Sequence, residues 1–324
     1  MTVKSNHDTL VTVFGGSGFL GRHVVRALAK RDYRIRVAVR RPELANFLQP
    51  LGRVGQIHAV QANLRHGPSV EAAARDAHVL VNLVGILAEG GRQRFNTVHT
   101  YGAEQIALAA NAHGARMVHV SAIGADANST ARYARSKAAA EQLVLAAQPQ
   151  ATIMRPSILF GPEDNFFNLF AGLARISPVL PLIGGGHTRF QPVFVGDAAS
   201  AIAAAVDGEA RPGTVYELGG PEVRTFKELM QFVLATTERK RMLVPVPFFF
   251  AKLKALGLQF MPSPLTLTPD QVELLRTDNV VSDAAIADRR TLQGLGIEPE
   301  TIEAIVPSYL WRFRKTGQFK SRAA

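Results

Sequence analysis

The sequence predicts an α/β fold built around a parallel, doubly wound sheet. Three observations support this prediction. Short runs of β-forming residues alternate with helix-like segments over the first half of the chain, a glycine-rich turn joins the first run to the first helix, and proline and glycine become frequent after residue 156. The chain has 324 residues, 47% of them hydrophobic, which is enough to bury one large core and a smaller appended region.

The expected elements follow in a regular order. Strands are expected at residues 10–14, 34–39, 57–60, 79–84, 117–121 and 151–154, and helices at 21–30, 70–75, 96–113 and 133–147. Because helical segments separate successive strands, the strands are expected to run parallel. Arg155 and Pro156 end this alternation. We therefore expect a sheet domain over residues 1–155 and a mixed, loop-rich region over 156–324 that completes a cleft at the carboxyl ends of the strands.

Charge is unevenly distributed along the chain. The 37 Lys and Arg exceed the 26 Asp and Glu, and the net charge of +11 favours acidic partners such as phosphorylated cofactors, anionic lipid or acidic protein surfaces. Residues 1–60 hold ten basic and three acidic side chains, and a basic tail is expected from about residue 307, with five basic and no acidic side chains. This tail fits either docking to a membrane or partner, or simple solvation. Nucleic acid is not an expected partner, because no recognised binding motif accompanies the charge.

Several classes of site are excluded or disfavoured. The chain has no cysteine, which excludes disulfides, thiolate catalysis and cysteine-ligated metal. His99, His113 and His119 lack metal-ligand spacing, so no metal site is expected. The N-terminus lacks the pattern of a secretory signal, and prolines and lysines interrupt the apolar segment 243–262, so no transmembrane segment is expected. That segment fits either core packing or an exposed lipid or protein contact.

The most informative motif is the turn Gly15-Gly16-Ser17-Gly18-Phe19-Leu20-Gly21. It follows an apolar run and opens a helical segment, and its glycines at 15, 18 and 21 let the backbone approach a pyrophosphate. Backbone amides and the positive end of the helix dipole can then hold the phosphate charge. The motif therefore predicts a dinucleotide site in a Rossmann-type sheet, and the alternative is an ordinary glycine-rich turn.

The end of the second strand selects between the two nicotinamide dinucleotides. Arg40 and Arg41 lie close to where an NAD-selective site carries an acidic residue for the ribose hydroxyls. A carboxylate there would repel a ribose phosphate, whereas a guanidinium binds it bidentately. We therefore expect NADP(H) rather than NAD(H); the alternative is that the arginines only face solvent. Asn63, which follows the third strand, is expected to reach the adenine edge.

A second set of residues carries candidate chemistry. Ser121 ends a predicted strand, and Tyr133 and Lys137 are four residues apart on one helix face. At this spacing the ammonium of Lys137 can lower the pKa of the phenol and also hydrogen-bond the nicotinamide ribose. Tyr133 would be the general acid in carbonyl reduction, with Ser121 orienting the carbonyl. The alternative is that Tyr133 and Lys137 are two ordinary residues on a helix surface. The cofactor loop and the strand-end serine elsewhere in the chain argue against it.

These motifs resemble those of the extended or atypical short-chain dehydrogenases/reductases. The resemblance covers most of residues 10–200 and rests on the glycine loop, Ser121, Tyr133 with Lys137, Asn82-Leu83-Val84-Gly85, the segment from Arg155-Pro156-Ser157 to Gly161-Pro162, and residues 191–197. It implies cofactor contacts from Gly15, Ser17, Gly18, Phe19, Leu20, Gly21, Arg40, Arg41, Asn63, Leu64, Val84, Gly85, Tyr133, Lys137 and Pro156. Arg155 is expected either to contact substrate or to make structural hydrogen bonds.

The chain departs from the pattern of that superfamily at two points. Only eleven residues separate Ser121 from Tyr133, fewer than in the sugar-nucleotide epimerases of the extended group, which puts a sugar-nucleotide substrate in doubt. Asn63 stands where many relatives carry Asp, which weakens its expected adenine contact.

Within the superfamily the chain is most similar to the 39 kDa accessory subunit family of respiratory complex I and its bacterial relatives. The similarity rests on residues 131–138, 155–162, 191–193 and 295–297, and on Tyr309-Leu310. It implies a tightly held NADPH and attachment to an inner-membrane assembly. The protein is accordingly expected to be cytoplasmic, or peripheral on the inner face of the cytoplasmic membrane. Relatives associated with ubiquinone biosynthesis also imply a quinone-like small molecule as a partner.

Two functions stay open from the sequence. The first is a cofactor-binding accessory or assembly protein of complex I or quinone metabolism, which the basic tail and the Phe248-Phe249-Phe250 cluster favour. The second is an active NADP(H)-dependent carbonyl reductase acting on a hydrophobic substrate, which Tyr133 and Lys137 favour. That pair does not decide between them, because both side chains also serve as nicotinamide-ribose ligands. The sequence slightly favours the accessory role.

Overall fold

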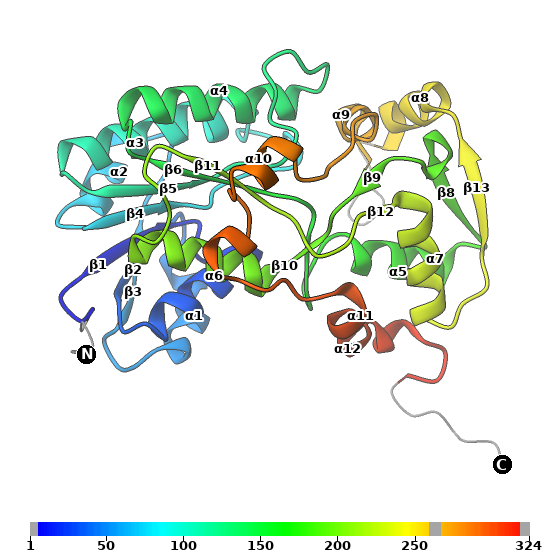
Figure 1. Cartoon of the computed structure of the whole chain (residues 1–324), viewed down its shortest axis with the longest axis horizontal. Coiled ribbons are helices and arrows are strands. Elements are labelled where there is room, and N and C mark those ends of the chain that lie inside the picture. Colours follow the sequence, from blue (N-terminus) through cyan, green and yellow to red (C-terminus); the bar gives the residue numbers. More distant parts are fainter. Residues whose placement is uncertain (1–5, 259–266, 318–324) are drawn as a thin grey trace. The chain divides into compact units, whose positions relative to one another are not determined.

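The chain forms two compact units (Figure 1). The computed structural model describes residues 6–258 and 267–317, so Lys320 and Arg322 of the expected basic tail lie outside the described residues. Unit 1 contains Met1–Pro156, Gly196–Leu218 and Asp283–Ile297, and unit 2 contains Ser157–Val195, Gly219–Ser282 and Glu298–Ala324.

Unit 1 is built on a seven-stranded parallel sheet with the strand order β11-β6-β5-β4-β1-β2-β3. The strands are β1 Leu10–Phe14, β2 Arg34–Val39, β3 Ile57–Gln61, β4 Val79–Asn82, β5 Arg116–Val120, β6 Thr152–Pro156 and β11 Val215–Leu218. The first six match the predicted strands to within two residues at each end. Because β1 pairs with β2 on one side and β4 on the other, the strand order reverses beside β1. In such sheets, ligands bind at the carboxyl ends of the strands near this reversal.

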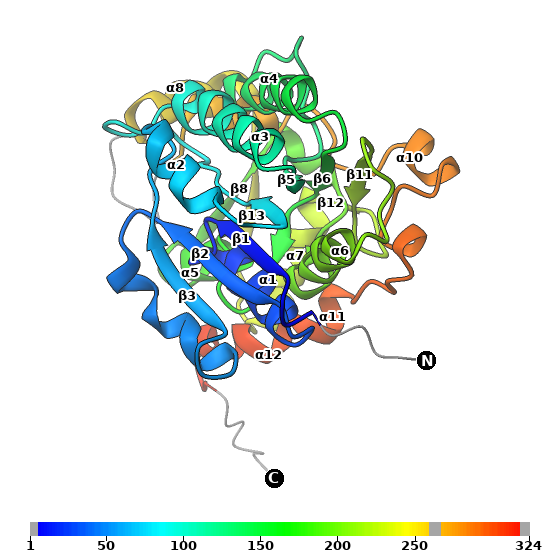
Figure 2. The ribbon, with the colours of Figure 1, turned by 90° about the vertical axis from the view of Figure 1, so that its left-hand side faces the viewer.

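Helices cover both faces of this sheet. Figure 2 shows α1 Phe19–Ala29 and α6 Val195–Asp207 on one face, and α2 Gly67–Ala74, α3 Gly102–Ala112 and α4 Arg132–Ala147 on the other. The single helix expected at 96–113 divides into the π-helical turn η2 Asn96–Tyr101 and α3. Short elements complete the unit: η1 Pro42–Leu51, α10 Asp283–Ala287 and η4 Gln293–Leu295.

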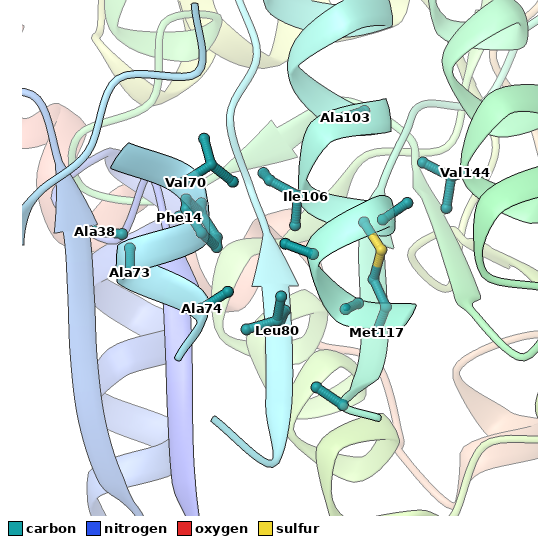
Figure 3. Packing of buried hydrophobic residues seen from close by; sticks show 14 of the residues in the cluster. Phe14, Ala38, Val70, Ala73, Ala74, Leu80, Ala103, Ile106, Met117 and Val144 are labelled. Carbon is teal, nitrogen blue, oxygen red and sulfur yellow. The ribbon is translucent and has the colours of Figure 1, made fainter. Parts of the chain in front are cut away.

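The core beneath α2, α3 and α4 explains why these segments pack on the sheet (Figure 3). Phe14 and Leu80 of the strands belong to one buried cluster with Ile106 of α3 and Val144 of α4, and all four side chains are fully buried. Burying one such side chain stabilises the fold by about 1.5–3 kcal/mol. The many alanines of α3 allow this helix to lie close to its neighbours.

The division into two contiguous domains is wrong in one respect. The boundary near residue 155 coincides with the end of β6, but β11 returns from the second half of the chain and pairs with β6, Val215 opposite Ile153 and Leu218 opposite Pro156. Arg155 and Pro156 are therefore the last residues of an internal strand. The strand β11 has only four residues, and its brevity hid it among the glycines and prolines around it.

The described residues of unit 2 form three two-stranded sheets and a set of helices. The pairs are β7 Leu159–Phe160 with β10 Val193–Phe194, β8 Val179–Ile183 with β13 Met242–Val246, and β9 Arg189–Phe190 with β12 Arg224–Thr225. The helical elements are α5 Phe167–Ile176, η3 Gly184–Gly186, α7 Phe226–Thr236, α8 Phe248–Leu258, α9 Pro269–Leu274, α11 Ile302–Ile305, α12 Pro307–Leu310 and η5 Trp311–Phe313. Phe160, Phe167 and Phe226 anchor an aromatic core, and a capping box at Thr225 begins α7.

Residues 307–313 form part of this core, so the basic tail does not begin at 307 as expected. Tyr309 and Leu310 are buried, and the hydroxyl of Tyr309 donates to Asp164 Oδ2 at 2.6 Å. The apolar segment was expected either to pack in the core or to form an exposed contact, and the three phenylalanines differ in this respect. Phe248 packs against a small buried cluster of unit 2, whereas Phe249 is 72% exposed and Phe250 56% exposed. Among the residues that the structure describes, no helix has both the length and the apolar character needed to cross a membrane.

Candidate functional site

A pocket of about 280 Å³ lies in unit 1 at the carboxyl ends of the first four strands. Its lining includes eight of the residues expected to contact a cofactor: Gly15, Ser17, Gly18, Arg40, Asn63, Leu64, Val84 and Gly85. It also includes residues that the sequence reasoning missed: Phe14, Ala38, Val39, Ala62, Arg65, Leu83, Ile86, Gln93 and Val98. No acidic side chain is among the described residues that line it.

The glycine turn at the end of β1 is shaped by two backbone requirements. Gly15 adopts a φ of +81°, a left-handed conformation that favours glycine, and Gly18 N donates to Gly15 O at 3.1 Å. A β-carbon on Gly21 would lie 2.4 Å from Gly15 O, so only glycine lets α1 pack this closely on the turn. Gly18 is the N-cap of α1 and supplies no side-chain cap. The first amides of α1 are therefore suited to an anion.

Cationic and polar side chains line this pocket at the carboxyl ends of β2 and β3. Arg40 and Arg41 are both exposed, but only Arg40 lines the pocket; Arg41 precedes η1. Asn63 Oδ1 accepts from the amide of Arg65 at 3.1 Å, which engages that oxygen within its own loop and would leave a base contact to Nδ2. Arg65 is a second lining cation, and its position two residues after Asn63 in the same strand-end loop was the available signal.

The remaining expected contacts lie outside the lining: Phe19, Leu20, Gly21, Arg41, Tyr133, Lys137 and Pro156. Pro156 ends β6, where its carbonyl accepts from Ile123 N at 3.0 Å. Lys137 is nevertheless adjacent to the pocket wall, because a β-carbon on Gly85 would lie 3.4 Å from its Nζ. The pocket wall after β4 thus connects the glycine turn to the helix that carries Tyr133 and Lys137.

The strand-end serine and the helix α4 come together around β5. Lys137 Nζ donates to the carbonyl of Val120, the residue before Ser121, at 3.2 Å, and lies 6.0 Å from the centroid of the Tyr133 ring. Ser121 is 4% exposed, and its Oγ has no hydrogen-bond partner among the described residues. A buried hydroxyl without a protein partner is an expected position for a water or a ligand oxygen.

Burial controls the protonation states at this site. Desolvation raises the pKa of Tyr133 to about 12 and lowers the pKa of Lys137 to about 8, while the carboxylate of Glu141 opposes the shift at Lys137. The expected lowering of the phenol pKa by the ammonium is therefore wrong: the ammonium lies over the ring, and desolvation dominates. At neutral pH Tyr133 is a protonated phenol, which can donate a hydrogen bond or a proton.

Arg155 has a structural role. Its Nε and Nη2 donate to Glu141 at 2.9 and 2.6 Å, and its Nη1 lies 3.6 Å from Glu217 Oε1 on β11. The hydrogen bond to Glu141 is the main reason why the pKa of Arg155 is raised. Arg155 thus ties α4, β6 and β11 together one helical turn below Lys137.

Of the histidines His99, His113 and His119, for which no metal site was expected, His99 and His119 are buried within unit 1. His119 Nδ1 pairs with Asn82 Nδ2 at 3.0 Å, and burial lowers the pKa of His119 to about 3. His99 is also buried and has hydrogen-bond partners on both ring nitrogens. In the described part of the chain, no group of three or more His, Cys, Asp or Glu side chains is arranged to hold a metal ion.

A model of the NAD dependent epimerase/dehydratase family matches residues 11–219, which span the glycine turn, Ser121, Tyr133 and Lys137. The chain belongs to this family. The family binds a nicotinamide dinucleotide, which agrees with the lining of the pocket. Its doubly wound, Rossmann-type fold is likewise that of the seven-stranded sheet.

Relatives within the family extend beyond the matched residues. Mitochondrial NADH dehydrogenase (ubiquinone) 1 alpha subcomplex subunit 9 of Arabidopsis thaliana is 38% identical over 320 residues, covering 95% of this chain and 79% of its own length. The ceramide reductase of Caulobacter vibrioides is 37% identical over 195 residues, 60% of each chain. The resemblance to accessory subunits of complex I, expected from the sequence, is confirmed.

A solved structure shares the fold. The NADPH-dependent quinone oxidoreductase QOR2 from Escherichia coli, determined in complex with NADPH, superposes with a TM-score of 0.73 over 93% of this chain and 99% of its own, at 19% identity.

Proposed function

We propose that this chain binds NADP(H) in the unit 1 pocket and serves as an accessory or assembly protein of respiratory complex I or of quinone metabolism. The pocket lining carries the proposal: within the described part of the chain it holds Arg40 and Arg65 and no carboxylate. An NAD-selective site would place an acidic residue against the ribose hydroxyls, and such a residue would repel the 2′-phosphate. Two guanidiniums instead match the charge and the geometry of that phosphate.

The accessory role is supported by the relatives and by the surface. Relatives that match nearly the whole chain are named as complex I subunits, and the Arabidopsis thaliana protein is among them. The formal net charge of +11 and the exposed Phe249 and Phe250 suit a protein that is peripheral on the inner face of a cytoplasmic membrane. We infer that the bound cofactor stabilises unit 1 in this role.

The test is the identity and the reactivity of the nucleotide that the purified, full-length protein retains. We expect NADPH in near-stoichiometric amount, and we expect it to resist oxidation by quinones added to the complex. Copurification with the membrane fraction is the second expected result. Retention of NADH would overturn the cofactor assignment, and a protein that is recovered only free of membranes and of complex I would overturn the accessory role.

An active carbonyl reductase is the second candidate, because Lys137 lies next to the pocket wall and Tyr133 is one turn away on the same helix. Its raised pKa keeps Tyr133 protonated at neutral pH, and Ser121 Oγ, which has no hydrogen-bond partner among the described residues, can orient a carbonyl oxygen. The ceramide reductase relative favours a hydrophobic carbonyl substrate.

If this second function holds, Tyr133→Phe lowers turnover by about 10²–10⁴-fold, because the proton donor is removed. Substrate-dependent NADPH oxidation at saturating NADPH measures this effect. The matched control is Tyr101→Phe, which removes the hydroxyl of an exposed tyrosine. Unchanged turnover in Tyr133→Phe would exclude Tyr133 as the proton donor.

A further inference from the structure

His99 is 1% exposed in the π-helical turn η2, and both of its ring nitrogens have partners. Nε2 lies 3.0 Å from the amide nitrogen of Ile86, and Nδ1 lies 2.9 Å from Ser136 Oγ. A backbone amide can only donate, so Nε2 accepts and Nδ1 carries the proton of the neutral ring. Nδ1–H then donates to Ser136 Oγ, and that hydroxyl donates to the backbone carbonyl of Tyr133 at 2.7 Å.

These hydrogen bonds join two elements that meet the cofactor site separately. Ile86 lines the pocket beside Gly85, in the loop that follows β4. Ser136 and Tyr133 belong to the first turns of α4, the helix that also carries Lys137. One imidazole thus connects the pocket wall to the helix that presents the candidate proton donor and ribose ligand.

Aromatic packing holds the same ring in place. Phe95 stacks on His99 with ring centroids 5.3 Å apart, and Tyr133 meets both rings edge-on, 5.5 Å from His99 and 5.9 Å from Phe95. Aromatic pairs favour these stacked and edge-to-face arrangements. A β-carbon on Gly85 would lie 3.7 Å from His99 Nε2, so the loop passes directly against the ring. The orientation of the Tyr133 ring is therefore coupled to that of His99.

The π-helical turn places this ring inside the unit. Turns of this kind are rare and occur frequently at functional sites. Consecutive residues of η2 have different roles here: Val98 lines the pocket, whereas His99 lies behind the pocket wall.

We propose that His99 is a positioning residue, which holds the loop after β4 against α4 so that a bound cofactor meets Tyr133 and Lys137 in one geometry. This inference rests on the proposed NADP(H) site. The ring performs this role in its neutral form, because protonation would place a donor opposite the amide of Ile86. Burial, together with the ammonium of Lys137 and the neighbouring His119, lowers the pKa of His99 to about 3. The hydrogen bonds should therefore persist throughout the physiological pH range.

Three variants of the full-length protein distinguish the role of His99 Nε2 from that of Nδ1. His99→Gln can keep an acceptor near the position of Nε2, His99→Asn can keep a donor near the position of Nδ1, and His99→Leu removes both. We expect the Kd for NADPH, measured by titration calorimetry, to rise about threefold in each of the first two variants and about tenfold in the third, since each removes hydrogen bonds of modest net strength. Partial recovery by Gln or Asn distinguishes positioning from the filling of space.

Two spectroscopic measurements complete the test. The emission of bound NADPH reports the surroundings of its nicotinamide, and we expect His99→Leu to shift it towards that of free NADPH. Nitrogen NMR of the wild-type ring should show the Nδ1–H form with no titration between pH 5 and 8. His58→Leu, which changes an exposed histidine on β3, is the matched control and should alter neither signal.

The NADPH affinity and emission of the His99 and Ser136 variants decide whether His99 has the positioning role. Ser136→Ala removes the middle of the hydrogen-bonded chain and leaves the ring in place, so it tests the inference if His99→Leu does not fold. Unchanged NADPH affinity and emission in His99→Leu and in Ser136→Ala would overturn the positioning role alone, as would titration of the wild-type ring near pH 6.5. A wild-type protein that binds neither NADPH nor NADH overturns both the proposed function and this inference.

Discussion

The glycine turn and the start of α4 lie near the same pocket wall of unit 1, but they depend on different physical effects. The glycine turn presents backbone amides, with Arg40 and Arg65 on neighbouring loops of the lining. Around α4, Lys137 and His99 are buried, and desolvation moves the pKa of each far from its usual value. The first region can recognise phosphate charge, and the second sets protonation states.

This difference separates cofactor binding from chemistry. Charge recognition at the glycine end requires shape and arginines, which a protein can keep without turning the cofactor over. Carbonyl reduction, the second candidate function, would require Tyr133 and Lys137 to hold the correct protons at the working pH. Variants at the glycine end should therefore change which nucleotide is bound, whereas variants around α4 should change how binding or turnover depends on pH.

The largest effect is expected from Gly21→Ala. The new β-carbon would lie 2.4 Å from Gly15 O and 2.6 Å from Gly16 C, and backbone atoms cannot move aside cheaply. We expect the free energy of unfolding to fall by about 3 kcal/mol and nucleotide binding to be lost. Chemical denaturation and NADPH titration measure these effects.

Gly257→Ala is the matched control for this prediction. A β-carbon at that position meets nothing within 4 Å, so its stability should be unchanged or slightly raised. Equal stability of the two variants would contradict the close packing of α1 on the glycine turn.

The sequence was sufficient to predict those elements of the fold that depend on local residue patterns. Six strands and the glycine turn follow from apolar runs and from glycine spacing, and both act over a few neighbouring residues. The strand β11 could not be recognised in this way, because its four residues gain their stability from pairing with β6 about sixty positions earlier.

The chemistry around α4 shows a similar limit. The spacing of Tyr133 and Lys137 correctly placed both residues on one helix, but it gave the wrong sign for the phenol pKa. The sign depends on desolvation, which comes from residues distant in sequence. The role of His99 depends on a π-helical turn and on contacts to residues 86 and 136, and periodicity does not predict either.

The second prediction tests which arginine reads the 2′-phosphate. Arg40→Asp replaces a lining guanidinium by a carboxylate, so we expect the Kd for NADPH to rise about 100-fold, or about 2.7 kcal/mol, with less than a threefold change for NADH. Arg41→Asp makes the same charge change at a neighbouring, exposed position outside the lining and should affect NADPH by less than tenfold. Equal losses for the two nucleotides in Arg40→Asp would contradict the phosphate site.

The smallest expected effect concerns pH and the region around α4. If the ammonium of Lys137 binds the nicotinamide ribose, a pKa of about 8 predicts that NADPH affinity is constant below pH 7 and falls about tenfold between pH 7 and 9, as the proton is lost. The effect on stability has the opposite sign. Because the pKa is depressed from 10.5 in the unfolded chain, the folded state releases its proton first, and the contribution of Lys137 to stability improves between pH 8 and 10.5.

Two variants sharpen this last prediction. Glu141→Gln removes the carboxylate that supports the ammonium, so the midpoint of the affinity profile should move below pH 8. Lys137→Met should abolish the pH dependence, while its bulk still fills most of the buried space. Titrations of NADPH against each variant from pH 6 to 9 measure both effects. An unchanged profile in Lys137→Met would show that the ammonium of Lys137 takes no part in holding the cofactor.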